Sequence, residues 1–158
     1  MVFPRKSVMI LAFLTILAST CLTPGTSKAA SMPSGSGVFA HYLTYTCLRK
    51  DASNSVVTRG ACAPSSTSGP QVWTLTHWSS GETRIRNVGD NKCLAVVNDK
   101  IVTRACVGGA PEAWTFDLKY AAGFRIRNVA TNMCIRHASF GSVFVSWCGG
   151  NDYLWNFL

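Results

Sequence analysis

The strongest constraint on the fold is a stretch of sequence that occurs three times. Residues 84–114 contain Arg-Ile-Arg-Asn-Val, Asn-Lys-Cys-Leu, Val-Thr, Cys and Glu-Ala-Trp in that order. Residues 125–155 repeat this order as Arg-Ile-Arg-Asn-Val, Asn-Met-Cys-Ile, Val-Ser, Cys and Tyr-Leu-Trp, shifted by 41 positions at the start. A more divergent first copy runs over residues 39–73. A period of about 40 residues indicates one supersecondary unit that is used repeatedly.

Each copy has the pattern of short β-strands. Ile85 lies between Arg84 and Arg86, which is the alternation typical of a half-buried strand, and Ile126 has the same surroundings. No amphipathic helical window occurs after the first 29 residues. Because exposed sheet edges are a liability, three copies of roughly four strands are expected to close on themselves. The sequence predicts an all-β barrel of about twelve strands with a hairpin cap.

The cysteines follow the repeat. Seven are present, and the six after Cys21 form three couples whose members are 15, 13 and 14 positions apart. Six cysteines alone allow about 15 pairings, but the repetition favours a pair within each copy. Trp73, Trp114 and Trp155 recur at one place in the repeat, so we expect them in the core.

The N-terminus has the layout of a secretory signal peptide. A basic start at Arg5 and Lys6 precedes an apolar run over residues 8–18 and a small-residue cleavage signal at residues 27–29. The run is too short to span a bilayer comfortably. We expect a signal peptide at 1–29, a flexible Ser/Gly tail at 30–37, one domain at 38–158, and a secreted protein. Lipidation of Cys21 is disfavoured because Thr20 stands where a small residue is normally required.

Composition and motifs exclude several function classes. Removal of residues 1–29 leaves 12 Lys and Arg against 7 Asp and Glu, a net charge of +5 that is too dispersed for a nucleic-acid partner. Gly-x-Ser-x-Gly, His-Glu-x-x-His and the P-loop do not occur, so we expect neither an enzyme nor a cofactor. The cysteine spacing differs from that of zinc pairs, and His77 and His137 have no second ligand at metal spacing, so no metal is expected.

The order of these motifs resembles the ricin B-type lectin repeat. A cysteine, an aliphatic residue, a Val-Thr or Val-Ser strand, a second cysteine and Gln-x-Trp occur in sequence, with Gln71-Val72-Trp73 as the literal match. The resemblance implies a β-trefoil with the three tryptophans in a shared core. It also implies one disulfide per lobe, namely Cys47–Cys62, Cys93–Cys106 and Cys134–Cys148. The function that it implies is binding of glycans or cell-surface glycoconjugates by a non-catalytic lectin-like module.

The sugar pockets of that family are degenerate here. The family places an Asp two residues after the first cysteine, an aromatic two residues before the second, and a polar residue before Gln-x-Trp. The Asp position holds Arg49, Ala95 and Arg136; the aromatic position holds Gly60, Arg104 and Ser146; the polar position holds Pro70, Pro111 and Asp152. No copy keeps the Asp and the aromatic together, so the standard galactose pocket is not expected.

Five residues are the candidate ligand contacts. Trp78 and Trp147 fall outside the core register, and indoles stack on sugars. Asp152 is the best remaining acceptor for hydroxyls, Tyr153 is an aromatic beside it, and Arg136 stands at the Asp position of the third copy. The paired arginines of residues 84–86 and 125–127 suit either an anionic glycan or a solvated strand face. His41 aligns with Asn87 and Asn128, which indicates a structural hydrogen-bonding position.

Two other functions remain open. The degenerate pockets and the Ile-Arg-Asn-Val-x-x-Asn-x-Cys pattern are similar to the cell-binding A and C subunits of cytolethal distending toxins. That likeness implies a delivery subunit that acts mainly through protein–protein contacts, with partner subunits that include a nuclease. Trefoils also serve as protease inhibitors that present one rigid loop, so the fold alone does not decide.

Overall fold

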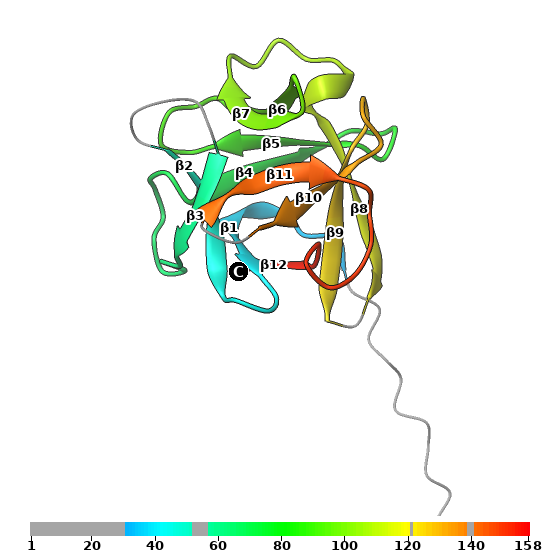
Figure 1. The fold of residues 1–158 in the computed structure, drawn as a ribbon. Coiled ribbons are helices and arrows are strands. Elements are labelled where there is room, and N and C mark those ends of the chain that lie inside the picture. Colours follow the sequence, from blue (N-terminus) through cyan, green and yellow to red (C-terminus); the bar gives the residue numbers. More distant parts are fainter. Residues whose placement is uncertain (1–30, 52–56, 121, 139–140) are drawn as a thin grey trace, which may run out of the picture.

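The computed structural model describes residues 31–51, 57–120, 122–138 and 141–158, so the predicted signal peptide at 1–29 lies outside the described residues. These residues form three lobes of four strands each (Figure 1). Lobe 1 comprises β1 (Gly35–His41), β2 (Thr46–Lys50), β3 (Val57–Ala61) and β4 (Val72–His77). Lobe 2 comprises β5 (Thr83–Asn87), β6 (Cys93–Val97), β7 (Lys100–Arg104), the short 3-10 helix η1 (Ala110–Glu112) and β8 (Ala113–Tyr120). Lobe 3 comprises β9 (Gly123–Asn128), β10 (Cys134–His137), β11 (Val143–Ser146) and β12 (Trp155–Phe157).

Six strands close into a ring. Antiparallel pairing runs from β1 to β4, β5, β8, β9 and β12, and β12 pairs with β1 again. The other six strands form the hairpins β2–β3, β6–β7 and β10–β11, one in each lobe. Each hairpin leaves the barrel at the same register, because Ala40, Arg86 and Arg127 pair with the first cysteine of their lobes. This is the closed barrel with hairpins that the repeat predicts, and it is the β-trefoil that the resemblance implies.

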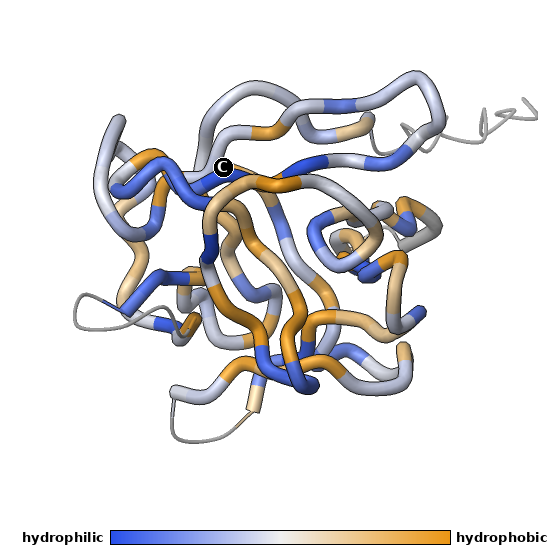
Figure 2. The backbone as a smooth tube through the Cα atoms, turned by 90° about the horizontal axis from the view of Figure 1, so that it is seen from above, coloured by the Kyte–Doolittle hydropathy of each residue, from blue (hydrophilic) through white to orange (hydrophobic). Residues whose placement is uncertain are grey.

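The core is shared by the three lobes. Trp73, Trp114 and Trp155 are fully buried in one cluster with residues from every lobe. Each indole Nε1 donates to the carbonyl of the residue after the first cysteine of its lobe, at 3.1, 3.0 and 3.2 Å. Seen from above, many of the hydrophobic stretches run along the central strands (Figure 2). The tryptophans therefore join the barrel to the hairpins.

The disulfide pairing within lobes is confirmed. Cys47 is bonded to Cys62, Cys93 to Cys106, and Cys134 to Cys148. Each bond joins the start of a hairpin to the segment that follows it, so it closes a loop that contains only its own hairpin.

The start of the domain differs from the prediction. The sequence predicts a flexible tail through residue 37, but β1 already begins at Gly35. Residues 35–37 pair with β4, opposite Leu75, Thr74 and Trp73. The composition of Ser and Gly concealed this strand because its stability comes from backbone pairing and not from side chains. Gly37 also lies so close to the backbone of Leu158 that a side chain would not fit.

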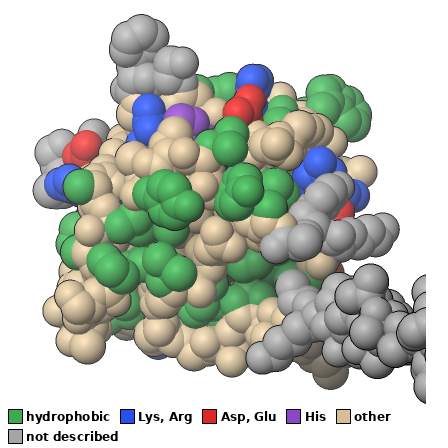
Figure 3. Space-filling view, turned by 90° about the horizontal axis from the view of Figure 1, so that it is seen from below, with side chains coloured by type: hydrophobic (Ala, Val, Ile, Leu, Met, Phe, Trp, Pro, Cys, Tyr) green, Lys and Arg blue, Asp and Glu red, His purple; other side chains and the backbone are tan. Residues whose placement is uncertain are grey.

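The surface keeps some hydrophobic groups, as is normal for a folded domain. Hydrophobic side chains are visible across the face seen from below (Figure 3). The large exposed ones in the described residues are Met32, Leu43, Tyr45, Val88, Val97, Val107, Trp147 and Leu158. None of the described helices has the length and hydrophobicity to cross a membrane.

Reduction of the disulfides is expected to lower the melting temperature. Each bond closes a loop of 13–15 residues, which is worth about 3 kcal/mol in the chain-entropy model. Calorimetry with and without reductant measures the effect. An unchanged melting temperature in protein whose free thiols have been verified would contradict a stabilising role for the bonds within lobes.

Candidate functional site

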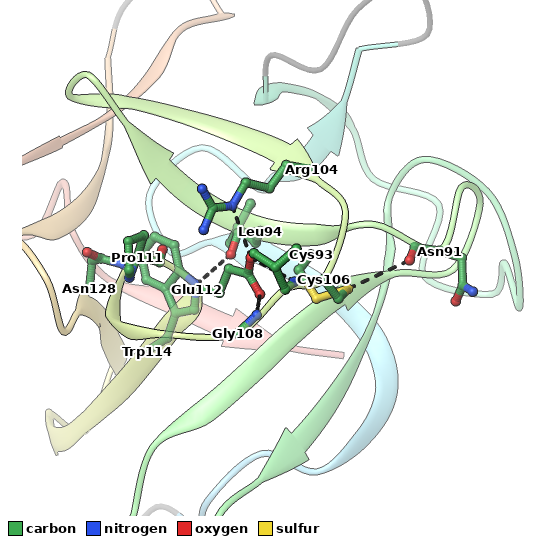
Figure 4. A network of polar contacts seen from close by, with 11 residues as sticks. Asn91, Cys93, Leu94, Arg104, Cys106, Gly108, Pro111, Glu112, Trp114 and Asn128 are labelled. Carbon is green, nitrogen blue, oxygen red and sulfur yellow. Dashed lines mark hydrogen bonds and ion pairs between the residues drawn. A yellow bond between two sulfur atoms is a disulfide. The ribbon is translucent and has the colours of Figure 1, made fainter.

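In lobe 2 a buried carboxylate and an arginine form an ion pair (Figure 4). Glu112, at the glutamine position of Gln-x-Trp, is fully buried. Its carboxylate accepts from Arg104 Nε at 3.0 Å and from the backbone N–H groups of Val107 and Gly108 at 3.2 and 2.9 Å. Arg104 stands where the family places its stacking aromatic. The two departures from the family pattern therefore compensate each other in charge.

Lobe 1 is filled in another way. Arg49 lies against Gly60, and its Cδ is 3.4 Å from the place where a Cβ of that glycine would stand. Gln71 is bound by the backbone of the same lobe, because its Oε1 accepts from Ala63 N at 2.9 Å and its Nε2 donates to the carbonyl of Ala61. The hollow that remains beside Arg49 has a volume of about 180 Å³.

Lobe 3 has a larger pocket, which it shares with lobe 1. We call it the junction pocket, and its volume is about 350 Å³. Lobe 1 contributes His41, Leu43 and Thr44, and lobe 3 contributes Arg136, His137, Ala138, Phe144 and Asp152. Residues 42–45 connect β1 to β2, so a turn of lobe 1 forms one wall and the β10–β11 hairpin forms the other.

Arg136 is held in place from three sides. Its Nη2 lies 3.5 Å from Asp152 Oδ2, and its guanidinium carbon is 5.6 Å from the ring centroids of both Phe144 and Tyr153. The side chains of Arg136 and Asp152 are 38% and 50% exposed, so both remain accessible. Arg136 Nε has no hydrogen-bond partner among the described residues. The pair therefore offers a fixed donor beside a fixed acceptor.

Two histidines meet across the boundary between the lobes. The rings of His41 and His137 stack with centroids 4.1 Å apart and an interplanar angle of 7°. Thr44 Oγ1 connects them, at 3.0 Å from His41 Nδ1 and 3.4 Å from His137 Nε2. His41 is almost completely buried, with 1% of its surface exposed.

The surroundings disfavour protonation of both rings. Burial, and next the neighbouring His137, lower the pKa of His41 to about 4, while the Asp152 carboxylate opposes this change. Burial and the Arg59 guanidinium also lower the pKa of His137. Both imidazoles are therefore neutral near pH 7.

An equivalent groove lies between lobes 1 and 2, and an ion pair crosses it. Lys50, Pro70, Asn87, Gly89 and Asp90 line it, and they stand where His137, Asp152, His41, Leu43 and Thr44 stand in the junction pocket. Lys50 Nζ and Asp90 Oδ2 form an ion pair at 3.0 Å across this groove, whose volume is about 250 Å³. In this groove the charged contact between Lys50 and Asp90 replaces the neutral contact that His137 and Thr44 make in the junction pocket.

Several departures from the threefold repeat lie at the junction pocket. Asn87 and Asn128 each donate to the two carbonyls on either side of the glutamine position in the preceding lobe, whereas the equivalent residue in lobe 1 is His41. Asp152 replaces a proline, and Phe144 replaces Thr58 and Val102. The departures elsewhere include the Arg104–Glu112 and Lys50–Asp90 ion pairs. Those at the junction pocket leave Arg136 and Asp152 more exposed than either pair.

The structure separates the five predicted ligand residues. Arg136 and Asp152 line the junction pocket, whereas Tyr153 is only 7% exposed, does not line it and contacts Arg136. Trp78 lies beyond the end of β4, with the Arg84 guanidinium carbon 5.2 Å from its ring centroid. Trp147 is 74% exposed on the segment after β11, outside the residues that line the pocket.

Sequence reasoning missed six of the eight residues that line the junction pocket, two of which are Leu43 and Ala138. Thr44, Phe144 and the two stacked histidines were not predicted as ligand contacts. His137, interpreted as isolated, in fact lies against His41, and His41 combines the expected buried position with a place at the pocket wall. The available signal was that His41 replaces Asn in an otherwise regular repeat. Among the described residues, no group of three or more His, Cys, Asp or Glu side chains could hold a metal ion.

Comparison with known proteins agrees with this architecture. Residues 69–142 match the family model described as ricin-type beta-trefoil lectin domain-like. The resemblance to ricin B-type lectins is thereby confirmed. The matched residues contain strands β4 to β10 of the trefoil. A comparison with curated protein sequences gave no significant match.

Solved structures share the trefoil at low sequence identity. The designed threefold-symmetric protein ThreeFoil has a TM-score of 0.69 and 15% identity, with 79% of this chain and 99% of that chain covered. A Polyporus squamosus lectin bound to a human-type influenza-binding epitope has a TM-score of 0.67 and 16% identity, with coverages of 81% and 50%. A mosquitocidal holotoxin has a TM-score of 0.66 and 18% identity, and the trefoil covers 78% of this chain but 16% of the toxin. The narrower likeness to cytolethal distending toxin subunits is not confirmed and stays a prediction.

Loss of the Arg104 side chain is expected to destabilise the trefoil. In Arg104→Ala the buried Glu112 carboxylate keeps its backbone donors but loses its cation. We expect the free energy of unfolding to fall by about 2–3 kcal/mol. The loss is smaller than for a fully buried pair because the Arg104 side chain is about one-third exposed. Arg104→Ala combined with Glu112→Gln is expected to recover most of this stability, since Gln71 serves at the same position in lobe 1. Denaturant unfolding measures the cycle, and a double variant as unstable as Arg104→Ala would contradict the charge compensation.

Acidification is expected to destabilise the trefoil through His41. Because burial lowers the pKa of His41 from 6.5 to about 4, the folded protein binds fewer protons than the unfolded chain between these values. This contribution to stability is complete above pH 6.5 and is lost as the pH falls toward 4. In His41→Asn, which restores the residue of the other lobes, the melting temperature should fall less over that range. Equal slopes for the two proteins would contradict the role of His41.

Proposed function

We propose that this protein is a secreted, non-catalytic carbohydrate-binding module for cell-surface glycans and that the junction pocket is its glycan site. One observation carries the proposal: the junction pocket is lined by an accessible Arg136–Asp152 pair and the Phe144 ring, which supply the groups that sugars need. The N-terminal layout of residues 1–29 supports secretion.

The groups at the pocket suit a pyranose ring. Sugar hydroxyls need fixed donors and acceptors, and Arg136 and Asp152 provide one of each within 3.5 Å. The apolar face of a sugar needs a flat partner, which the partly exposed Phe144 ring can provide. Arg136 is held between two aromatic rings, so little conformational entropy is lost when it binds a ligand.

The other two lobes support binding at one site. In lobe 2 the Arg104–Glu112 pair fills the sugar position, and in lobe 1 the Arg49 side chain lies across Gly60. The pockets of these lobes are degenerate in our proposal, and the trefoil is monovalent. The sequence offers no nucleophile or metal motif of a known enzyme class, which supports a binding role without catalysis.

A delivery subunit of a toxin assembly is the alternative. The exposed side chains of Trp147 and Val107, which are 74% and 76% exposed, would suit a protein partner. Co-purification with a nuclease-like chain would favour that role over glycan binding. Inhibition of a protease by a chain cleaved within residues 64–70 would favour a trefoil inhibitor.

Replacement of the Asp152 carboxylate is expected to abolish most glycan binding. Asp152→Asn keeps the size of the side chain and removes the charge that orients Arg136, so we expect affinity to fall about tenfold or more. The measurement is binding of the intact protein to a printed glycan array, followed by calorimetry with the strongest-binding free glycan.

The matched control is Asp90→Asn, which removes a carboxylate from the equivalent groove between lobes 1 and 2. This variant should bind like the wild type. Equal losses for the two variants, or no loss for Asp152→Asn, would exclude the junction pocket as the site. A wild-type protein that binds no glycan on the array would refute the proposed function itself.

A further inference from the structure

We propose that Leu43 and Tyr45, in the turn between β1 and β2, form a second subsite beside the junction pocket, and that its ligand is a neutral oligosaccharide of at least two residues. The inference rests on the proposed function, because it assigns a further part of the same ligand. In this proposal lobe 3 supplies the charged groups of the pocket, and lobe 1 determines which oligosaccharide binds there.

The turn stands directly at the rim of the pocket. Leu43 and Thr44 line the pocket, and Tyr45 follows them in the chain. The Leu43 side chain is 50% exposed and Tyr45 is 75% exposed. Two large apolar side chains next to a polar pocket offer a surface on which the C–H face of a further sugar residue can lie.

Tyr45 has a backbone conformation that suits another residue better. Its φ is 52°, in the left-handed region, and the equivalent residues Asn91 and Asn132 have φ values of 63° and 56°. Asparagine tolerates this region, whereas a bulky side chain there is uncommon and unfavourable. The Tyr45 ring is exposed, so packing within this chain does not offset the unfavourable backbone conformation. Contact of the ring with a ligand would explain why an aromatic residue stands at this position.

The turn is rigid enough to present the ring. Tyr45 N donates to the carbonyl of His41 at 3.0 Å, as Asn91 N and Asn132 N do in the equivalent turns. The hydroxyls of Thr44 and Thr46 are 2.8 Å apart, and Cys47 is held by its disulfide to Cys62. A preordered turn loses little entropy when a ligand binds.

The charge of the pocket favours a neutral ligand. Arg136 is paired with Asp152, and the two histidines are neutral near pH 7 because burial lowers the pKa of each. Arg59 is the other cation that acts on both rings, and its Nη1 donates to Thr46 Oγ1 at 3.3 Å. A carboxylated sugar at Arg136 would be repelled by the neighbouring Asp152 carboxylate, whereas a pair of hydroxyls can bind both groups at once.

The variant Tyr45→Asn tests the second subsite. It restores the residue that the other two lobes use, so the fold is expected to be as stable as in the wild type or more stable. Binding is measured on an array of neutral glycans of one to four residues printed with their sialylated counterparts, and by calorimetry with the strongest neutral glycan and its terminal monosaccharide. We expect Tyr45→Asn to weaken oligosaccharide binding about three- to tenfold and to leave monosaccharide binding unchanged. Leu43→Ala should act in the same direction.

The matched control is Val107→Ala, since Val107 is 76% exposed but belongs to lobe 2. It should bind both ligands like the wild type. If the wild type binds glycans but Tyr45→Asn weakens monosaccharide and oligosaccharide equally, or neither, the second subsite is refuted and the proposed function stands. Preference for the sialylated glycans would overturn the neutral ligand. If the wild type binds no glycan, the proposed function and the subsite fail together.

Discussion

Each lobe depends on one buried hydrogen bond, from a tryptophan indole to the carbonyl that follows the first cysteine. Trp73, Trp114 and Trp155 make this bond at nearly equal lengths, and all three rings meet in one core. The bond ties barrel strand to hairpin, and the neighbouring disulfide ties the hairpin to its return segment. A single lobe could not bury its tryptophan, so three copies must fold together. This requirement keeps the core regular and leaves the loops between lobes free to differ.

The loops between lobes are where the protein acquires an individual surface. The Lys50–Asp90 ion pair crosses the groove between lobes 1 and 2, whereas the equivalent positions between lobes 3 and 1 hold His137 and Thr44. The regular core positions these side chains without being altered by them. Function in our proposal therefore comes from broken symmetry, since a fully symmetric chain would present three identical grooves.

The sequence was sufficient for the fold because the repeat compares equivalent residues within each copy. The cysteine pairs and the three tryptophans are visible in this way, and only the start of β1 at Gly35 was missed. The site was harder to predict because it lies between copies. Thr44 and His137 are 93 positions apart, and no spacing motif joins them. Asp152 and Arg136 were found as deviations from a family pattern, but their ion pair depends on how lobe 3 folds. Trp147 was prominent by its type alone, and its exposure places it outside the pocket lining.

Amide NMR with a bound neutral glycan would test most directly whether the irregular junction is the ligand site, because each lobe supplies an equivalent turn as an internal reference. We expect the largest shift changes at residues 42–46 and 136–138, with little change at the matching turns of residues 88–92 and 129–133. Comparable changes in all three turns would show that the lobes bind alike and that the departures from the repeat do not create the site.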